Sequence, residues 1–283
     1  MSSSAVLTSV RRLRSLLAGQ HGQEQSDEQL LTAFADRRDD LAFATLVCRH
    51  GPMVLGVCRR VLGHEQDAED AFQATFLVLA RRAAALHNKT ALGSFLHGTA
   101  YNLASKVKRV ASRRRKYEGR APERSSVSPS DELLWREVQA LLDEEIARLP
   151  EIYRSAFVFC CLENLSRAEA GRRLGLKERT VSNRLAEARK RLSQRLARRG
   201  VELTAVLAAI TLATPAVPAA LVASTMKAAL ATAAGDGLAG VVSASVAELV
   251  RSATMVGKTK IATVLLLALT LLGGAGVCFL ASP

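Results

Sequence analysis

The sequence predicts an all-α protein: two small helical domains joined by a linker, then a helical C-terminal extension that ends in one transmembrane helix. Aromatic residues make up only 4% of the 283 residues, and runs of alternating β-branched residues are scarce, which disfavours sheets. A polar stretch rich in proline and serine separates two blocks of amphipathic helix. The predicted segments are a flexible tail at 1–25, a first domain at 26–116, the linker at 117–130, a second domain at 131–199, an alanine-rich extension at 200–260 and the membrane span at 261–281.

Composition narrows the class of protein. A formal net charge of +13 indicates a polyanionic partner, either nucleic acid or an anionic membrane surface. The five cysteines form no CxxC pair and do not cluster with the five histidines at metal-ligand spacing, so we expect neither a metal site nor a cofactor. The Walker loop, GxSxG and HExxH are absent, so the protein is not predicted to be an enzyme. Trp135, the one tryptophan, is expected in the core of the second domain.

The stretch 166–196 predicts two helices joined by a tight turn. Ser166 is suited to cap the first helix, Glu169 completes a capping box, and Gly175 is the expected left-handed residue that ends the helix. A second helix from Lys177 or the next residue has an apolar stripe for packing on the first. Its other face combines small hydrogen-bonding groups with cations, as a DNA-recognition helix does, although a merely solvated basic helix is the alternative. The predicted DNA-contacting residues are Arg179, Thr180, Ser182, Asn183, Arg184 and Arg191.

Three helices are predicted in the first block before residue 84. Ser26 is suited to cap the first, and the second begins near Asp39, with Pro52 expected to kink or restart it and Gly63 to end it. The third begins with acidic residues, which suit the positive end of the helix dipole. An alternative is that an acid-amide-aromatic face of this helix binds a basic protein partner. That face consists of Asp67, Asp70, Gln73 and Phe76.

A fourth helix, predicted over 92–116 with Ser94 as its cap, ends in a basic run. Aromatic and amide side chains beside dense cations suit single-stranded nucleic acid, because bases stack on rings while cations hold phosphates. A core aromatic pair followed by a solvated basic tail is the alternative. The predicted nucleic-acid contacts are Phe95, Tyr101, Asn102, Lys106, Lys108, Arg109 and Arg113.

The order of these segments, over roughly residues 27–199, resembles a bacterial sigma factor of the extracytoplasmic-function (ECF) group of the sigma-70 family. DAEDAFQATFLVLARR resembles region 2.2, which implies that the acid-amide-aromatic face contacts core RNA polymerase. Residues 95–116 correspond to regions 2.3 and 2.4, which melt and read the minus-10 element, although Phe95 stands where the family usually has Trp and Lys106 where many members have Asp. LPEIYRSAFVFCCLENLSRAEAGRRLGL resembles region 4, which reads the minus-35 element.

The resemblance implies a sigma factor that binds core RNA polymerase and promoter DNA, and it leaves open whether an anti-sigma protein binds. The alternative is a membrane-anchored helix-turn-helix regulator that does not bind polymerase as a sigma subunit. In that case residues 27–116 would be a sensor or dimerisation domain.

The C-terminal apolar stretch predicts the membrane anchor. Ile261–Ala281 has 21 uncharged residues, roughly 31 Å as a helix against a hydrocarbon core of ~30 Å. Arg251, Lys258 and Lys260 precede it and no charge follows, which predicts a single-pass protein at the cytoplasmic face of the inner membrane with its N-terminus inside. A buried globular helix is the weaker alternative. For Leu203–Met226, also uncharged, several threonines and prolines favour a membrane-associated or packed helix over a second span.

Overall fold

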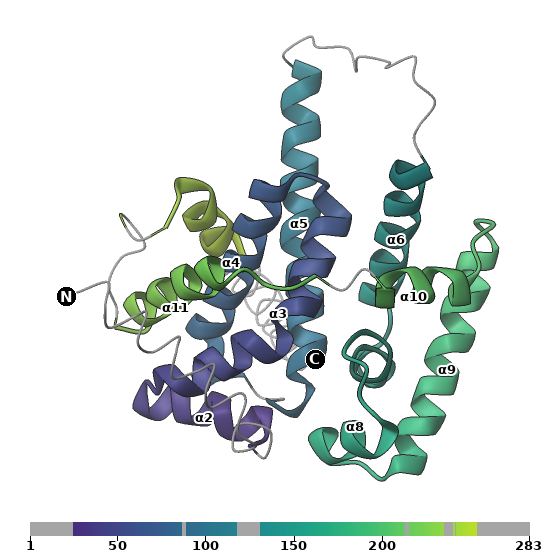
Figure 1. Ribbon diagram of the computed structural model, residues 1–283, viewed down its shortest axis with the longest axis horizontal. Coiled ribbons are helices and arrows are strands. Elements are labelled where there is room, and N and C mark those ends of the chain that lie inside the picture. The colour runs from purple at the N-terminus through teal and green to yellow at the C-terminus, as the bar shows by residue number, and fades with distance from the viewer. Residues whose placement is uncertain are drawn as a thin grey trace, which may run out of the picture.

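In the computed structural model, every named element is a helix, and the all-α prediction is confirmed for the described residues (Figure 1). The structure describes residues 25–86, 89–117, 131–212, 215–234, 240 and 242–253. The predicted membrane span lies outside them, as do residues 1–24 of the tail and 118–130 of the linker.

A first bundle is built from α2 (Asp27–Arg37), α3 (Asp40–Leu62), α4 (Glu65–Arg82) and α5 (Leu92–Tyr117). Ser26 caps α2 through a reciprocal capping box, as the sequence predicts. Phenylalanine rings form the centre of this bundle, because only large side chains fill the space between four helices. Phe34, Phe43, Phe72 and Phe76 are fully or almost fully buried there, with neighbouring ring centroids 4.4 to 6.4 Å apart.

The central helix α3 continues through Pro52 and ends at Gly63, which has a positive φ of 72°. Among the described residues it is the one helix long and apolar enough to cross a membrane. However, 72% of its apolar window is buried inside the protein. This burial is typical of the core helix of a bundle.

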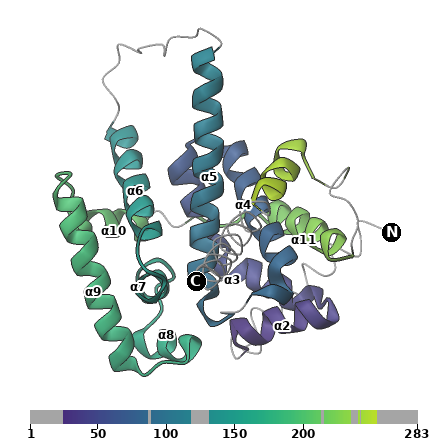
Figure 2. The same ribbon diagram turned by 180° about the vertical axis from the view of Figure 1, so that it is seen from behind.

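The second group contains α6 (Asp131–Ala147), α7 (Glu151–Phe157), a π-helical turn (Val158–Leu162, η4), α8 (Arg167–Leu174) and α9 (Glu178–Ala197). It packs on the first bundle, with α6 against α3 and α5, and with α7 and η4 against α5. Figures 1 and 2 show α6 alongside α5, with α9 at the outer edge. One continuous hydrophobic core therefore joins the two groups.

The C-terminal extension runs over both groups. Its first helix, α10 (Leu203–Leu212), packs on α9 and α6, and α11 (Ala219–Ala234) packs on α4 and α3 (Figure 1). A further helical stretch covers residues 244–253. Because residues 215–218 are not helical, Leu203–Met226 is not one continuous helix, and the preference for a packed segment over a second span is confirmed.

The predictions for two residues, Trp135 in the core and Ser94 as a helix cap, are wrong. Trp135 is 45% exposed, because α6 enters the core through its C-terminal half, at Leu142 and Ile146, and not through its first turns. Ser94 does not cap α5, which begins earlier at Leu92. It is buried, and its hydroxyl accepts a hydrogen bond of 2.8 Å from Arg154 Nε of α7.

Replacing Phe76 tests whether the phenylalanine cluster holds the first bundle together. We expect Phe76→Ala to lower the free energy of unfolding by about 3 to 5 kcal/mol, because it leaves a cavity among packed rings. Phe95→Ala is the control, since that ring is only partly buried and its removal costs less. Urea unfolding measures both variants, and an equal cost for the two contradicts the central position of Phe76.

Candidate nucleic-acid interface

The helix-turn-helix is formed by α8 and α9, and its turn follows the local signals in the sequence. Ser166 Oγ accepts a 3.1 Å hydrogen bond from Glu169 N, and Gly175 ends α8 with φ 65°. These boundaries are confirmed, but the capping box is only half formed, because the Glu169 carboxylate binds Arg172 and Arg173 instead. The turn brings the chain back onto α8. A Cβ on Gly171 would lie 2.7 Å from the backbone oxygen of Leu176, so only glycine fits there.

The two faces of α9 differ as the sequence predicts. The apolar stripe of Val181, Leu185, Ala188 and Leu192 is buried. On the polar face, Arg179 and Asn183 are exposed, whereas Thr180, Ser182 and Arg184 are partly exposed. The N-terminal half of α9 therefore presents hydrogen-bonding groups and cations to solvent, where a major groove can receive them.

Arg191 differs from the other predicted contacts on α9. Its guanidinium lies 4.5 Å from the centroid of the Tyr153 ring, and its Nε donates a 2.6 Å hydrogen bond to Glu187. The Glu187 hydrogen bond raises the pKa of Arg191, so this side chain stays charged. Arg191 thus helps to hold α9 on α7, a role that the sequence analysis missed.

The predicted contacts on α5 fall on two sides of the helix. Spacings of seven, four, three and four residues place five of them on one stripe. Tyr101 and Lys108 lie on another side, and Tyr101 is partly buried. Asn102, Arg109 and Arg113 are exposed, whereas Lys106 is partly buried. The stripe consists of Phe95, Asn102, Lys106, Arg109 and Arg113.

Three residues of the predicted acid-amide-aromatic face of α4 reach the surface, but the fourth does not. Asp67, Asp70 and Gln73 are partly exposed. Phe76 is completely buried and packs on Phe43 and Phe72. The exposed part, here called the acid-amide face, therefore consists of Asp67, Asp70 and Gln73.

Buried charges fix α6 to the first bundle. The Asp143 carboxylate is fully buried and accepts hydrogen bonds of 2.7 and 2.9 Å from Arg60 and one contact of 3.2 Å with His97 Nε2. Burial alone would raise the pKa of Asp143, but Arg60 and His97 outweigh it and lower this pKa to about 2. The carboxylate is therefore ionised at neutral pH and depends on its partners.

A second buried cluster links α3 to the residue after η4. His50 Nδ1 lies 2.7 Å from Glu163 Oε1, and His50 Nε2 lies 3.1 Å from Asp27 Oδ2. Burial alone would lower the pKa of His50, but Glu163 and Asp27 raise it to about 10. The imidazole is therefore a cation that bridges two carboxylates, while Arg49 also pairs with Asp27.

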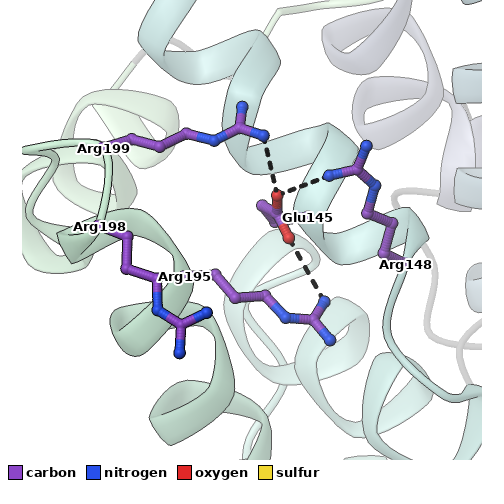
Figure 3. A pocket seen from close by; sticks show the side chains of 5 residues that line it. All are labelled: Glu145, Arg148, Arg195, Arg198 and Arg199. Carbon is purple, nitrogen blue, oxygen red and sulfur yellow. Dashed lines mark hydrogen bonds and ion pairs between the residues drawn. The ribbon is translucent and has the colours of Figure 1, made fainter.

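Arginines gather in a pocket beside the C-terminal end of α9 (Figure 3). The buried Glu145 carboxylate pairs there with Arg148, Arg195 and Arg199, and the figure shows Arg198 without a bond to it. Glu144 also pairs with Arg148 and Arg199, so four cations face two carboxylates and this end of α9 keeps a positive charge. Such a surface attracts phosphate.

A helix-turn-helix with an exposed polar face, together with a cationic stripe on a second helix, defines a DNA-binding protein. Comparison with known families narrows this class. The sigma-70 region 2 model matches residues 46–116, and the sigma-70 region 4 model matches residues 139–192.

Three relatives are sigma factors, and two of them are named as ECF sigma factors. The ECF RNA polymerase sigma factor SigM of Mycobacterium tuberculosis is 32% identical over 171 residues, which are 60% of this chain and 84% of SigM. The ECF RNA polymerase sigma factor SigE of Mycolicibacterium smegmatis is 33% identical over 180 residues, 59% of this chain and 67% of SigE. The RNA polymerase sigma-H factor of Pseudomonas aeruginosa is 28% identical over 177 residues, 58% of this chain and 91% of that factor.

The chain belongs to the ECF sigma factors of the sigma-70 family. It is a non-enzymatic factor for transcription initiation, and membership of the family implies core RNA polymerase and promoter DNA as its partners.

The charge of His50 can be tested by pH. Because its pKa is raised from 6.5 to about 10 on folding, the stabilisation is complete below about pH 6.5 and is lost as pH rises toward 10. We expect His50→Gln to cost on the order of 3 kcal/mol at pH 6 and progressively less up to pH 10. Urea unfolding followed by Trp135 fluorescence measures the difference. The exposed His64→Gln is the control, and a cost for His50→Gln that does not change with pH contradicts a charged imidazole.

Proposed function

We propose that this sigma factor binds its partners through three separate surfaces within the domains 26–116 and 131–199. The acid-amide face of α4 contacts core RNA polymerase, the stripe on α5 contacts the minus-10 element, and the N-terminal half of α9 reads the minus-35 element. The observation that carries the proposal is the division of α9, whose apolar stripe is buried while Arg179 and Asn183 are exposed. A base-reading helix needs this arrangement.

The stripe on α5 suits a melted strand more than a duplex. Phe95 lies at its start, partly exposed beside the core, and the cations Lys106, Arg109 and Arg113 follow along the same side. A ring that stacks on a base and a row of cations that holds the phosphates are the two elements of single-strand binding. Phe76 is not part of the polymerase contact in this proposal, because its ring is completely buried in the first bundle.

We further propose that Ile261–Ala281 tethers the protein to the inner membrane, with the N-terminus in the cytoplasm. The support is the sequence: 21 uncharged residues preceded by Arg251, Lys258 and Lys260. The last described residue, Ala253, lies on α4 through a hydrogen bond from Arg82. Ala253 and Ile261 are eight positions apart, which the chain spans over at most roughly 27 Å, so the sigma domains would lie close to the membrane surface.

Run-off transcription with core RNA polymerase tests the function as a whole. The full-length chain in detergent is expected to give discrete start sites on a pool of genomic promoters, whereas core alone gives none. A chain that binds promoter DNA but neither binds core nor starts transcription would instead be a helix-turn-helix regulator.

Arg184 tests the minus-35 contact. If this arginine contacts a base edge, Arg184→Ala is expected to weaken binding to the cognate sequence by about 1 to 3 kcal/mol and to reduce discrimination against base changes. Lys190→Ala, further along the exposed side of α9, is the control for a phosphate contact. Its loss should be the same on every sequence. Fluorescence anisotropy measures both, and a uniform loss for Arg184→Ala would make that residue a phosphate contact.

Leu267 tests the tether. A Leu267→Arg change near the middle of the span should cost about 2.5 to 3.5 kcal/mol for insertion, and it is expected to release a fraction of the protein from membranes. Leu267→Ala is the uncharged control and should stay bound. Carbonate extraction followed by fractionation measures the distribution, and a wild-type protein found entirely in the soluble fraction contradicts the tether.

A further inference from the structure

We propose that the C-terminal extension covers the acid-amide face of α4 and must be displaced before core RNA polymerase can bind. The proposal rests on the proposed polymerase contact. The covering part consists of residues 215–234 and 242–253, here called the cover. It is an interaction surface already occupied by the chain's own segment.

Asp70 is the point where the cover meets the acid-amide face. Ser245 Oγ donates a hydrogen bond to Asp70 Oδ2, and Ser243 Oγ lies 3.4 Å from Asp70 Oδ1. The two hydroxyls are 2.9 Å apart. Both oxygens of the carboxylate thus have partners within the chain. A basic side chain from another protein cannot pair fully with Asp70 while these serines remain in place.

The cover also contacts the C-terminal end of α4. Arg82 Nη2 donates a 3.1 Å hydrogen bond to the backbone oxygen of Ala253. Asp70 and Arg82 are twelve residues apart, roughly 18 Å along a helix. Between these two contacts Val246 and Val250 are completely buried. Residues 242–253 therefore contact α4 at two points, at Asp70 within the predicted polymerase contact and at Arg82 beyond it.

The start of the cover fits a groove of small residues on α3. A Cβ on Gly51 would lie 3.0 Å from Val217 Cγ2, and a Cβ on Gly56 would lie 3.5 Å from Pro215 Cδ. Close approach of Val217 to α3 therefore depends on the glycine. From there α11 continues onto α4, with Leu221, Ala228 and Ala229 buried against the bundle. Contacts on two helices of the bundle make the cover a defined docked element.

The composition of the cover favours release. Most side chains of α11 are alanine, serine or threonine, and each of these buries little apolar area compared with leucine or phenylalanine. The ring–ring contacts of the phenylalanines all lie among α2, α3 and α4, while the cover joins the same core through smaller side chains, such as Leu221 and Val246. The cover also leaves a gap, because Gln66, Glu69 and Gln73 line an open pocket with Ser224 and Val242. Polymerase can begin to bind at this edge.

Hydrogen exchange on the full-length chain in detergent tests the proposal directly. When core RNA polymerase is added to the wild type, amides in 242–253 are expected to exchange faster, while amides in the first half of α4 exchange more slowly. Displacement of the cover exposes its amides to solvent, so faster exchange in 242–253 reports its release.

Ser245 provides the matched variants. Ser245→Asp places a carboxylate beside Asp70, so it should speed exchange in 242–253 and strengthen core binding by about tenfold, because more of the chain is in the binding-competent form. Ser245→Thr keeps the hydroxyl and should behave as wild type. If Ser245→Asp does not fold, a chain with both Ser243→Ala and Ser245→Ala serves the same purpose.

Three outcomes overturn the cover while leaving the proposed polymerase contact intact. The first is that protection of the amides in 242–253 does not change when core RNA polymerase binds. The second is that an opened variant, either Ser245→Asp or the double alanine variant, binds core no more tightly than wild type. The third is that hydrogen exchange in the Ser245→Asp chain equals that of wild type. Failure of both wild type and opened variants to bind core is a different result. It removes the proposed polymerase contact itself, and the cover with it.

Discussion

The arrangement of the two helical groups depends on the buried carboxylate of Asp143. An ionised group that leaves water without a partner costs several kcal/mol, and removing one partner of a buried pair costs about as much. Arg60 of α3 and His97 of α5 supply the two contacts, so α6 has to lie where both helices reach it. α9 and α10 pack directly on α6, and α7 and α8 pack on α9. The position of α6 therefore constrains all four helices.

Local sequence signals were sufficient to predict the helices, but they did not predict the orientation of every side chain. The ends of α8 and α9 follow from Ser166, Gly175 and the apolar stripe, all within a few residues of one another. The error at Phe76 has a geometric cause. A spacing of three residues turns a helix by about 300°, so each step drifts by about 60°. Three such steps from Asp67 turn Phe76 by about 180°, to the buried side with Phe72.

The contacts that join distant parts of the chain could not be predicted from one sequence. Arg60 and Asp143 are 83 residues apart, His50 and Glu163 are 113 apart, and Asp70 and Ser245 are 175 apart. Ionisable side chains are ordinarily exposed, so no local pattern marks these as buried partners. One signal was present at Asp143, which lies next to Leu142 and three residues before Ile146, and so shares a side of α6 with these two buried residues.

The same buried charges constrain how the sigma factor can engage a promoter. The minus-10 and minus-35 elements lie roughly 25 base pairs apart, roughly 85 Å at ~3.4 Å per step. Here α5 and α9 both pack on α6, and packed helices lie about 8–10 Å apart, so the two are within roughly 20 Å of each other. If α5 and α9 read those elements together, α6 must leave α3 and α5, and residues 118–130 can extend over roughly 44 Å. Opening breaks the contacts of Asp143 with Arg60 and His97 and the contact of His50 with Glu163. Their free energy therefore opposes promoter binding until polymerase and DNA together offset it.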